Sequence, residues 1–166
     1  MIIRHATETD LPGIVEIYNS TVASQIVTAD TATVTVNDRL PWFQSHHRDR
    51  HPIWISEQNG QVAGWLSLSA FYGRPAYEPT AELSVYVGPK HRRQGVGKAL
   101  VETAIAHCPS LQISTLLGFV FAQNQPSLAL LEKFGFEQWG FLPRVAQFES
   151  HACDLVILGL NGLNES

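Results

Sequence analysis

The sequence predicts an α/β fold of the α+β kind, in which a mixed, mostly antiparallel central sheet carries helices on both faces. Two patterns predict it: three consecutive strand patterns come early in the chain, and a strand–helix–strand–helix unit follows them. Of the 166 residues, 45% are hydrophobic, which is enough to bury one core of ordinary size. We therefore expect a single domain over residues 1–166, with a frayed tail at residues 164–166.

The amino-terminal part of the chain predicts one strand and two helices. Residues 2–6 form a short opening strand, and Thr9 or Asp10 can cap a helix that has Pro12 in its first turn. Apolar residues recur at helical spacing through this helix, at Leu11, Ile14, Val15 and Tyr18. Residues 21–35 lack periodicity and are expected to be irregular, as a loop beside a site would be. A second, short helix is expected over residues 38–46.

An antiparallel hairpin is predicted near the middle of the chain. Residues 53–57 and 62–69 alternate apolar and polar side chains on either side of Asn59-Gly60, the residue pair that favours a tight two-residue turn. A loop broken by glycine and proline follows at residues 71–79, and residues 81–87 form a β-branched strand.

The carboxy-terminal half alternates helices and strands. The expected order is helix, strand, helix, strand, strand, over residues 97–108, 113–121, 126–134, 137–145 and 153–160. Pro109 is expected to stop the first of these helices and Gly135 to end the second. The whole order is therefore β-α-α-β-β-β-α-β-α-β-β.

Composition and charge exclude several classes of function. A net charge of −4 and a pI near 5.9 give no general attraction to nucleic acid. The two cysteines, Cys108 and Cys153, lie in apolar contexts that fit reduced core residues better than a disulfide framework. No apolar run approaches membrane-spanning length, and the amino terminus lacks a signal-peptide pattern. We expect a cytoplasmic protein that binds neither nucleic acid nor membrane.

The most informative stretch is the basic turn after the strand at residues 81–87. Gly95 and Gly97 stand at a helix start, where free backbone N–H groups attract anions and glycine lets a ligand approach. Four cations add positive charge there, namely Lys90, Arg92, Arg93 and Lys98. A P-loop is excluded because Arg92 and Ala99 replace required residues, and a dinucleotide fingerprint because Leu100 replaces its third glycine. A turn with solvated charges is the plain alternative to an anion site.

Arg92-x-x-Gly95-x-Gly97 after a β-rich strand resembles the acetyl-CoA motif of the GNAT acetyltransferase superfamily. Shorter matches along nearly the whole chain resemble its phosphinothricin acetyltransferase branch, among them Ile17-Tyr18-Asn19, Gly64-Trp65, Arg74-Pro75-Ala76-Tyr77, Glu82-x-Ser84-Val85-Tyr86-Val87 and Asn124-x-x-Ser127. The resemblance implies the GNAT acyl-CoA N-acyltransferase fold, acetyl-CoA-dependent N-acetyltransferase activity and a homodimer.

The same resemblance implies acetyl-CoA as co-substrate and no metal. The backbone of the strand would bind the pantetheine arm, the turn would wrap the pyrophosphate, and the start of the last helix would contact the cofactor. The implied cofactor-binding positions are Val85, Tyr86, Val87, Arg92, Arg93, Gln94, Gly95, Val96, Gly97, Lys98, Asn124 and Ser127. For Asn124, a purely local turn or cap is the alternative.

Acetylation of an amine needs a base that removes a proton and a donor that stabilises the developing oxyanion. Alternation puts Glu82, Ser84 and Tyr86 on one face of their strand. A carboxylate in an apolar strand is costly to desolvate unless something uses or pairs it. The resemblance points to Glu82 as general base, acting through water, and to a backbone N–H near Val85 as oxyanion donor. The alternative for Glu82 is a charge that faces solvent or pairs with Arg74.

Leu131 stands where many superfamily members have tyrosine and the branch has histidine, and leucine cannot donate a proton to a leaving thiolate. Tyr86 or Ser127 could help instead, or the thiolate leaves without a donor. The resemblance implies small amino-acid-like acceptors of the phosphinothricin or methionine sulfone/sulfoximine type. Its implied substrate-binding positions are Arg74, Pro75, Tyr77, Glu82 and Ser84, with Arg74 gripping a carboxylate.

Two other functions stay open at this point: acetylation of protein or polyamine amines, and a non-catalytic acyl-CoA-binding module. A metal site at the histidine-rich run of residues 46–51 is not favoured. No cysteine or carboxylate pair completes a ligand set nearby, so we expect a solvated polar turn there.

Overall fold

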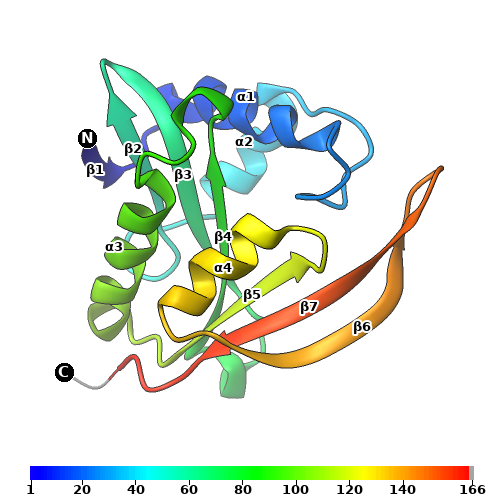
Figure 1. Cartoon of the computed structure of the whole chain (residues 1–166). Coiled ribbons are helices and arrows are strands. Elements are labelled where there is room, and N and C mark those ends of the chain that lie inside the picture. Colours follow the sequence, from blue (N-terminus) through cyan, green and yellow to red (C-terminus); the bar gives the residue numbers. More distant parts are fainter. Residues whose placement is uncertain (165–166) are drawn as a thin grey trace.

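A computed structural model describes residues 1–164, in which seven strands form one twisted sheet of order β1-β2-β3-β4-β5-β7-β6. Neighbouring strands are antiparallel except for β4 and β5. Four α-helices accompany the sheet, which gives the predicted mixed architecture (Figure 1). In chain order the elements are β1 (Ile2–His5), α1 (Leu11–Val22), α2 (Val36–Gln44), β2 (Ile53–Gln58), β3 (Gln61–Ala70), β4 (Thr80–Val87), α3 (Val96–Leu111), β5 (Thr115–Phe121), α4 (Gln125–Lys133), β6 (Glu137–Gln147) and β7 (Ala152–Leu160). The fraying predicted for the last residues falls largely on residues 165–166, outside the described range.

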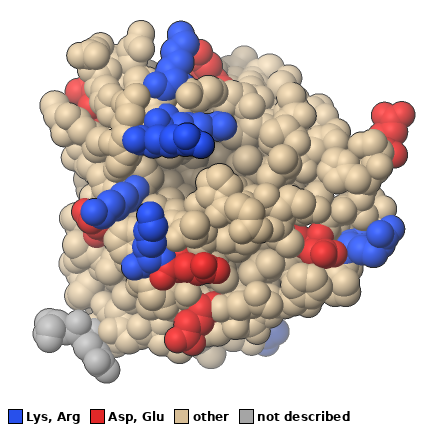
Figure 2. All heavy atoms as spheres, viewed as in Figure 1, with Lys and Arg blue, Asp and Glu red and all other residues tan. Residues whose placement is uncertain are grey.

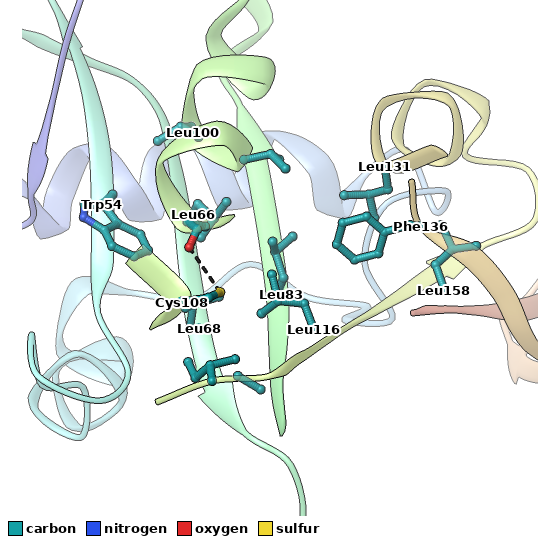
Figure 3. Packing of buried hydrophobic residues seen from close by; sticks show 14 of the residues in the cluster. Trp54, Leu66, Leu68, Leu83, Leu100, Cys108, Leu116, Leu131, Phe136 and Leu158 are labelled. Atoms are coloured by element: carbon teal, nitrogen blue, oxygen red, sulfur yellow. Dashed lines mark hydrogen bonds between the residues drawn. The ribbon is translucent and has the colours of Figure 1, made fainter. Parts of the chain in front are cut away.

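Helices cover both faces of the sheet, and each face has its own core. On one face α1 and α2 pack over β2 and β3, with Leu11, Ile14, Ile55 and Trp65 buried between them. On the other face α3 and α4 cover β3, β4 and β5. Figure 3 shows part of this second core, in which Leu66, Leu83, Leu100, Leu116, Leu131 and Leu158 are all buried. Burial of two such layers is the main favourable term in the stability of the fold.

The hairpin between β2 and β3 is confirmed with a two-residue loop. Gln58 pairs with Gln61, so Asn59 and Gly60 alone make the connection. Both have positive φ, 51° and 75°, which is the backbone conformation of the turn that Asn-Gly favours. On its other edge β3 pairs antiparallel with β4, so residues of these two strands lie opposite one another.

The predicted end of the helix at Pro109 is wrong, since α3 runs through this residue to Leu111. Proline removes one backbone N–H and crowds one carbonyl a turn earlier, a small loss so near the end of a helix. Leu111 is buried and anchors the last turn, and Gln112 ends the helix in the left-handed conformation, its N–H donating to the carbonyl of Cys108. In consequence the next strand begins at Thr115 rather than at residue 113.

The helix caps also differ in part from the expectation. Asp10 precedes α1, but its carboxylate accepts from the Arg4 guanidinium, at 2.8 Å and 2.9 Å, and from the Thr7 N–H instead of from the helix. Helix α2 begins at Val36, two residues before the predicted start, because Thr35 and Asp38 form a reciprocal capping box. Between α1 and α2 the chain is irregular, as predicted.

The sheet divides between β4 and β5, and this division forms the site described below. β4 stays paired with β3 as far as Val87, and β5 stays paired with β7 as far as Phe121. β4 and β5 themselves pair only from Thr80 to Glu82, opposite residues 115–117. From Leu83 onward, the edge of β4 that faces β5 therefore has no neighbouring strand.

A glycine fixes how closely the start of α3 approaches the sheet. A Cβ atom on Gly64 would lie 2.7 Å from Val96 Cγ1 and 2.9 Å from the backbone oxygen of Tyr86. We expect Gly64→Ala to lower the free energy of unfolding by about 1–3 kcal/mol, measured by urea denaturation. Because Val96→Ala removes one of the two clashes, the double variant should lose less than the sum of the single losses. Unchanged stability of Gly64→Ala would contradict this account.

Candidate functional site

The turn between β4 and α3 presents a row of free backbone N–H groups. Arg93 and Gly95 have positive φ, 62° and 79°, and the side-chain amide of Gln94 donates to the carbonyl of Lys90 at 3.2 Å. The first helical bond runs from the Ala99 N–H to the Gly95 carbonyl at 3.0 Å. Within residues 1–164, none of the N–H groups from Arg93 to Lys98 has a hydrogen-bond acceptor. Such a row at a helix start is an anion-binding arrangement.

Positive charge surrounds this row. Arg92, Arg93 and Lys98 are exposed, and Lys98 makes one long contact, 3.9 Å, with the exposed carboxylate of Glu102. Figure 2 shows Lys and Arg side chains gathered over this part of the face, beside a hollow in the surface. The helix start also packs tightly at Gly97, where a Cβ atom would lie 3.1 Å from Leu130 Cδ2. At Gly95, by contrast, no atom of residues 1–164 other than those of its chain neighbours lies within 4 Å of where a Cβ atom would be, so a phosphate group could approach the backbone closely there.

A narrow cavity continues from the division of the sheet, between β4 and β5. Its walls are Val27, then Leu83, Ser84, Val85 and Tyr86 of β4, Phe119 and Val120 of β5, and Asn124, Ser127 and Leu131 around α4. We call it the slot. Because the free edge of β4 forms one wall, the slot offers backbone hydrogen-bonding groups to an extended ligand.

Two side chains of the slot hold α4 in place. The side-chain oxygen of Asn124 accepts from the Ser127 N–H at 3.3 Å, so the local cap that sequence alone left open is present. Leu131 is 2% exposed, and a Cβ atom on Gly118 would lie 2.9 Å from its Cδ1 atom. Figure 3 shows Leu131 among the apolar side chains of the core. Leu131 therefore gives the slot an apolar wall without a proton donor.

A second, wider cavity of about 330 Å³ lies on the other face of β4, under α1 and α2. Its floor is made of three cross-strand pairs, Trp65 with Tyr86, Ser67 with Ser84, and Ser69 with Glu82. Its walls are Tyr18, Thr28, Ala29, Asp30, Arg39 and Trp42. We call it the acceptor pocket. The alternation predicted for Glu82, Ser84 and Tyr86 is thus present. The volume of the pocket is in the range of small-molecule sites.

Glu82 carries an unusual carboxylate in this pocket. Its side chain is partly buried and has no hydrogen bond or ion pair with any of the described residues, so the alternative pairing with Arg74 does not occur. Burial raises the pKa of Glu82 above its ordinary value, because water is the best solvent for the charged form. A raised carboxylate pKa next to a cavity is typical of a general acid or base.

Tyr86 and Ser84 line both cavities, so the slot and the acceptor pocket meet across β4. Burial raises the pKa of Tyr86 to about 12, and its phenol therefore stays neutral at ordinary pH. Its ring stacks on Trp65 with centroids 4.6 Å apart and meets the edge of Tyr18 at 5.5 Å.

Several predicted positions do not line either cavity. Arg74, Pro75 and Tyr77 lie in the loop between β3 and β4, which begins just beyond Ser69 of the pocket floor. The site positions predicted from the sequence in turn include none of the six wall residues, namely Tyr18, Thr28, Ala29, Asp30, Arg39 and Trp42. The aromatic residues and the arginine lie on the pocket side of α1 and α2. No local motif distinguishes them from ordinary helix residues.

The histidine-rich run does not gather ligands for a metal. His46 contacts the carbonyl of Trp42 at 2.7 Å and the hydroxyl of Ser69 at 3.3 Å, and His47 pairs through its backbone with His51. Across the described part of the chain, no group of three or more His, Cys, Asp or Glu side chains could hold a metal ion. No helix within residues 1–164 is both long and apolar enough to span a membrane.

The model of a family described as the acetyltransferase (GNAT) family matches residues 14–136. A Bacillus subtilis (strain 168) relative named "Putative phosphinothricin acetyltransferase YwnH" is 48% identical over 160 residues, which cover 96% of this chain and 98% of that one. The "L-amino acid N-acyltransferase MnaT" of Escherichia coli (strain K12) is 31% identical over 96% and 93% of the two chains. A Salmonella typhimurium (strain LT2) "L-methionine sulfoximine/L-methionine sulfone acetyltransferase" is 29% identical over 96% and 94%.

Solved structures resemble this chain over almost its whole length. A crystal structure described as "a putative phosphinothricin N-acetyltransferase" is 46% identical, with a TM-score of 0.92 and coverage of 99% of both chains. The structure of "yncA, a putative ACETYLTRANSFERASE from Salmonella typhimurium with its cofactor Acetyl-CoA" is 29% identical, with a TM-score of 0.91 and coverage of 99% and 95%. The fold that these neighbours share is the one the sequence predicts.

The raised pKa of Glu82 makes a prediction about stability. A carboxyl group whose pKa is higher in the folded protein than its unfolded value of about 4.5 destabilises the fold once pH rises above the unfolded pKa. At pH values well below both pKa values the group is protonated in both states, and it then has no such effect. Glu82→Gln should therefore raise the free energy of unfolding near pH 7 and leave it unchanged near pH 3.5, in urea denaturation at a series of pH values. Glu132→Gln, at an exposed position, is the matched control and should change little at either pH. A gain that does not depend on pH would contradict the proposed cause.

Proposed function

Because this chain belongs to the GNAT acetyltransferase family, we propose that it transfers the acetyl group of acetyl-CoA to the primary amine of a small amino-acid-like acceptor. The observation that carries the proposal is the meeting of two cavities across β4. One cavity leads to an anion-binding turn and the other contains a half-buried carboxylate. Ser84 and Tyr86 line both, and the acetyl group would pass between the two ligands beside them.

The turn and the slot fit acetyl-CoA. The six free N–H groups from Arg93 to Lys98 would bind the diphosphate, with Arg92, Arg93 and Lys98 adding charge. The free edge of β4 at Val85, Tyr86 and Val87 would hydrogen-bond the amides of the pantetheine arm. Asn124 and Ser127 line the slot near the start of α4 and would contact the same arm. The likeness to a solved structure named with acetyl-CoA supports this assignment.

Glu82 would act as the general base on the acceptor side. The acceptor ammonium gives a proton to the Glu82 carboxylate through one water molecule, and the amine nitrogen then attacks the thioester carbonyl. A backbone N–H near Val85 donates to the carbonyl oxygen while it carries negative charge. The C–N bond forms, the C–S bond breaks and coenzyme A leaves as its thiolate, while the attacking nitrogen loses its second proton to water as the amide forms. Its thiolate form is accessible near neutral pH, so the apolar Leu131 does not prevent the reaction.

The size and the polar floor of the acceptor pocket support a small acceptor over a protein or polyamine amine. About 330 Å³ is enough for one amino-acid-sized molecule, and Ser67, Ser69 and Ser84 supply hydroxyl groups along the floor. Relatives named for phosphinothricin, methionine sulfone and methionine sulfoximine act on molecules of this size. Arg74, Pro75 and Tyr77 stay predicted contacts of the acceptor, from the loop beside the pocket.

The first test of this function is turnover. We expect the protein to release thiol from acetyl-CoA in the presence of methionine sulfone or phosphinothricin, and much less with spermidine or a lysine peptide. Glu82→Gln should lower kcat/KM by about 10²- to 10⁴-fold, because it removes a positioned base. It should keep the protection that acetyl-CoA gives against thermal unfolding, since Glu82 is absent from the slot. Thermal protection without turnover on any amine would favour the non-catalytic acyl-CoA-binding module.

We further propose that the protein is a cytoplasmic homodimer. Apolar side chains on the edge strand β6 support the dimer: Trp139 is 45% exposed and Val145 is 53% exposed, with Phe141 and Leu142 between them. β6 and β7 extend as a long hairpin beyond the helices (Figure 1). Large apolar side chains exposed along an edge strand favour association with a partner.

A charged substitution within this patch tests the dimer. Phe141→Asp should shift the molar mass in light scattering from that of a dimer to that of the 18.4 kDa monomer, with unchanged circular dichroism. Glu149→Gln, an exposed change near the tip of the same hairpin, should leave the dimer intact. A monomeric wild-type protein would refute the homodimer.

A further inference from the structure

Arg39 is the one arginine or lysine among the residues that line the acceptor pocket. It comes from α2, and its guanidinium carbon lies 4.4 Å from the ring centroid of Tyr18 and 5.6 Å from that of Trp42. These contacts hold a planar cation against aromatic faces, which is favourable and restricts its motion. The side chain keeps 25% of its surface exposed.

Arg39 closes a ring of aromatic contacts around one end of the pocket. Tyr18 meets Tyr86 at 5.5 Å, Tyr86 stacks on Trp65 at 4.6 Å, and Trp65 meets Trp42 at 5.4 Å between ring centroids. Tyr18 and Trp42 both contact the guanidinium, so four rings fix its position relative to β3 and β4. A cation held in this way is prepared for a ligand before the ligand arrives.

The guanidinium uses little of its hydrogen-bonding capacity. Its polar contact within residues 1–164 is one long hydrogen bond, 3.5 Å, from Arg39 to the carboxylate of Asp30. That carboxylate is half exposed and also accepts from the hydroxyl of Tyr18. Arginine has five N–H donors in a fork that matches a carboxylate or a phosphinate. Most of the fork is therefore available to an anion in the pocket.

The pocket contains further donors without partners. The indole N–H of Trp65 is buried and has no acceptor among the described residues, although the residue is only 4% exposed. Ser67 is 3% exposed and lines the pocket, and its hydroxyl has no hydrogen bond to residues 1–164. The Ser67 hydroxyl is therefore available to a polar atom of a ligand, whereas the Trp65 N–H is enclosed by the protein.

From these contacts we infer that the guanidinium of Arg39 binds the anionic group of the acceptor. Asp30 is the counter-ion of Arg39 while the pocket is free of substrate. The inference rests on the proposed acetyl transfer and names the residue that selects acidic acceptors. It gives this role to Arg39 rather than to Arg74, which is exposed on the neighbouring loop and does not line the pocket. The anion is either the α-carboxylate of the acceptor or an acid on its side chain.

A comparison of acids with their neutral analogues tests the inference. For the wild-type protein, kcat/KM should be about 10- to 100-fold higher for methionine sulfone than for methionine sulfone carboxamide. Arg39→Gln should lower kcat/KM for the acid by about the same factor and leave the carboxamide almost unchanged, so that the preference disappears. Arg39→Lys keeps the charge but loses the fork of N–H donors, so its preference for the acid should lie between those of the wild-type protein and Arg39→Gln. If Arg39 binds the side-chain acid of the acceptor, Arg39→Gln will lower kcat/KM for phosphinothricin but not for methionine sulfone.

Matched controls separate this inference from the proposed function and from misfolding. Arg48→Gln removes the same charge at an exposed position outside the pocket and should keep the preference for the acid. Acetyl-CoA should raise the melting temperature of Arg39→Gln as it does that of the wild-type protein, because Arg39 is absent from the slot. Failure of the wild-type protein to acetylate any amine would refute the proposed function itself. An active wild-type protein that keeps its full kcat/KM for both methionine sulfone and phosphinothricin in Arg39→Gln, or loses it in Arg74→Gln instead, would overturn the assignment to Arg39.

Discussion

The division of the sheet between β4 and β5 is the constraint on which the rest of the site depends. β4 remains with β3 and β5 remains with β7, so three paired residues join two halves that then separate. A strand edge inside a protein normally costs free energy when its N–H and C=O groups have no partner. Here the free edge from Leu83 to Tyr86 becomes a wall of the slot, and the same strand leads directly into the anion-binding turn. In the proposed function, one backbone feature would thus form the places of both the pantetheine arm and the diphosphate.

The opposite face of the same strand is organised by side chains instead of backbone. Tyr86 of β4 stacks on Trp65, and Trp65 meets Trp42 of α2, so these rings tie the position of α2 to β4. Because the rings also hold Arg39, the cation of the pocket is positioned by packed side chains and not by a surface loop. The acceptor would therefore be oriented by the packing of α1 and α2, whereas the acetyl donor would be oriented by the sheet.

Features that depend on neighbours in sequence could be predicted, and features that depend on distant neighbours could not. The Asn59-Gly60 turn, the alternation of Glu82, Ser84 and Tyr86, and the glycine-containing turn after β4 each follow from local backbone preferences. Arg39 was missed because its position in the pocket depends on Tyr18, a residue of another helix that contacts it only in the folded protein. The end of α3 was misplaced for a similar reason, since burial of Leu111 outweighs the local cost of Pro109.

The pKa values of the entering amine and of the leaving thiol explain why an apolar Leu131 is compatible with activity. The ordinary pKa of a thiol is about 8.5 and that of an alkyl ammonium about 8–10, so near pH 7 the amine needs to lose a proton more than the thiolate needs to gain one. Tyr86, with a pKa of about 12, could supply a proton only weakly, although it lies at the junction of both cavities. Glu82 has a raised pKa and no protein partner, which brings its affinity for protons closer to that of the amine. In the proposed reaction, catalysis would therefore be needed mainly on the acceptor side of β4, where the Glu82 carboxylate has no hydrogen bond or ion pair with residues 1–164.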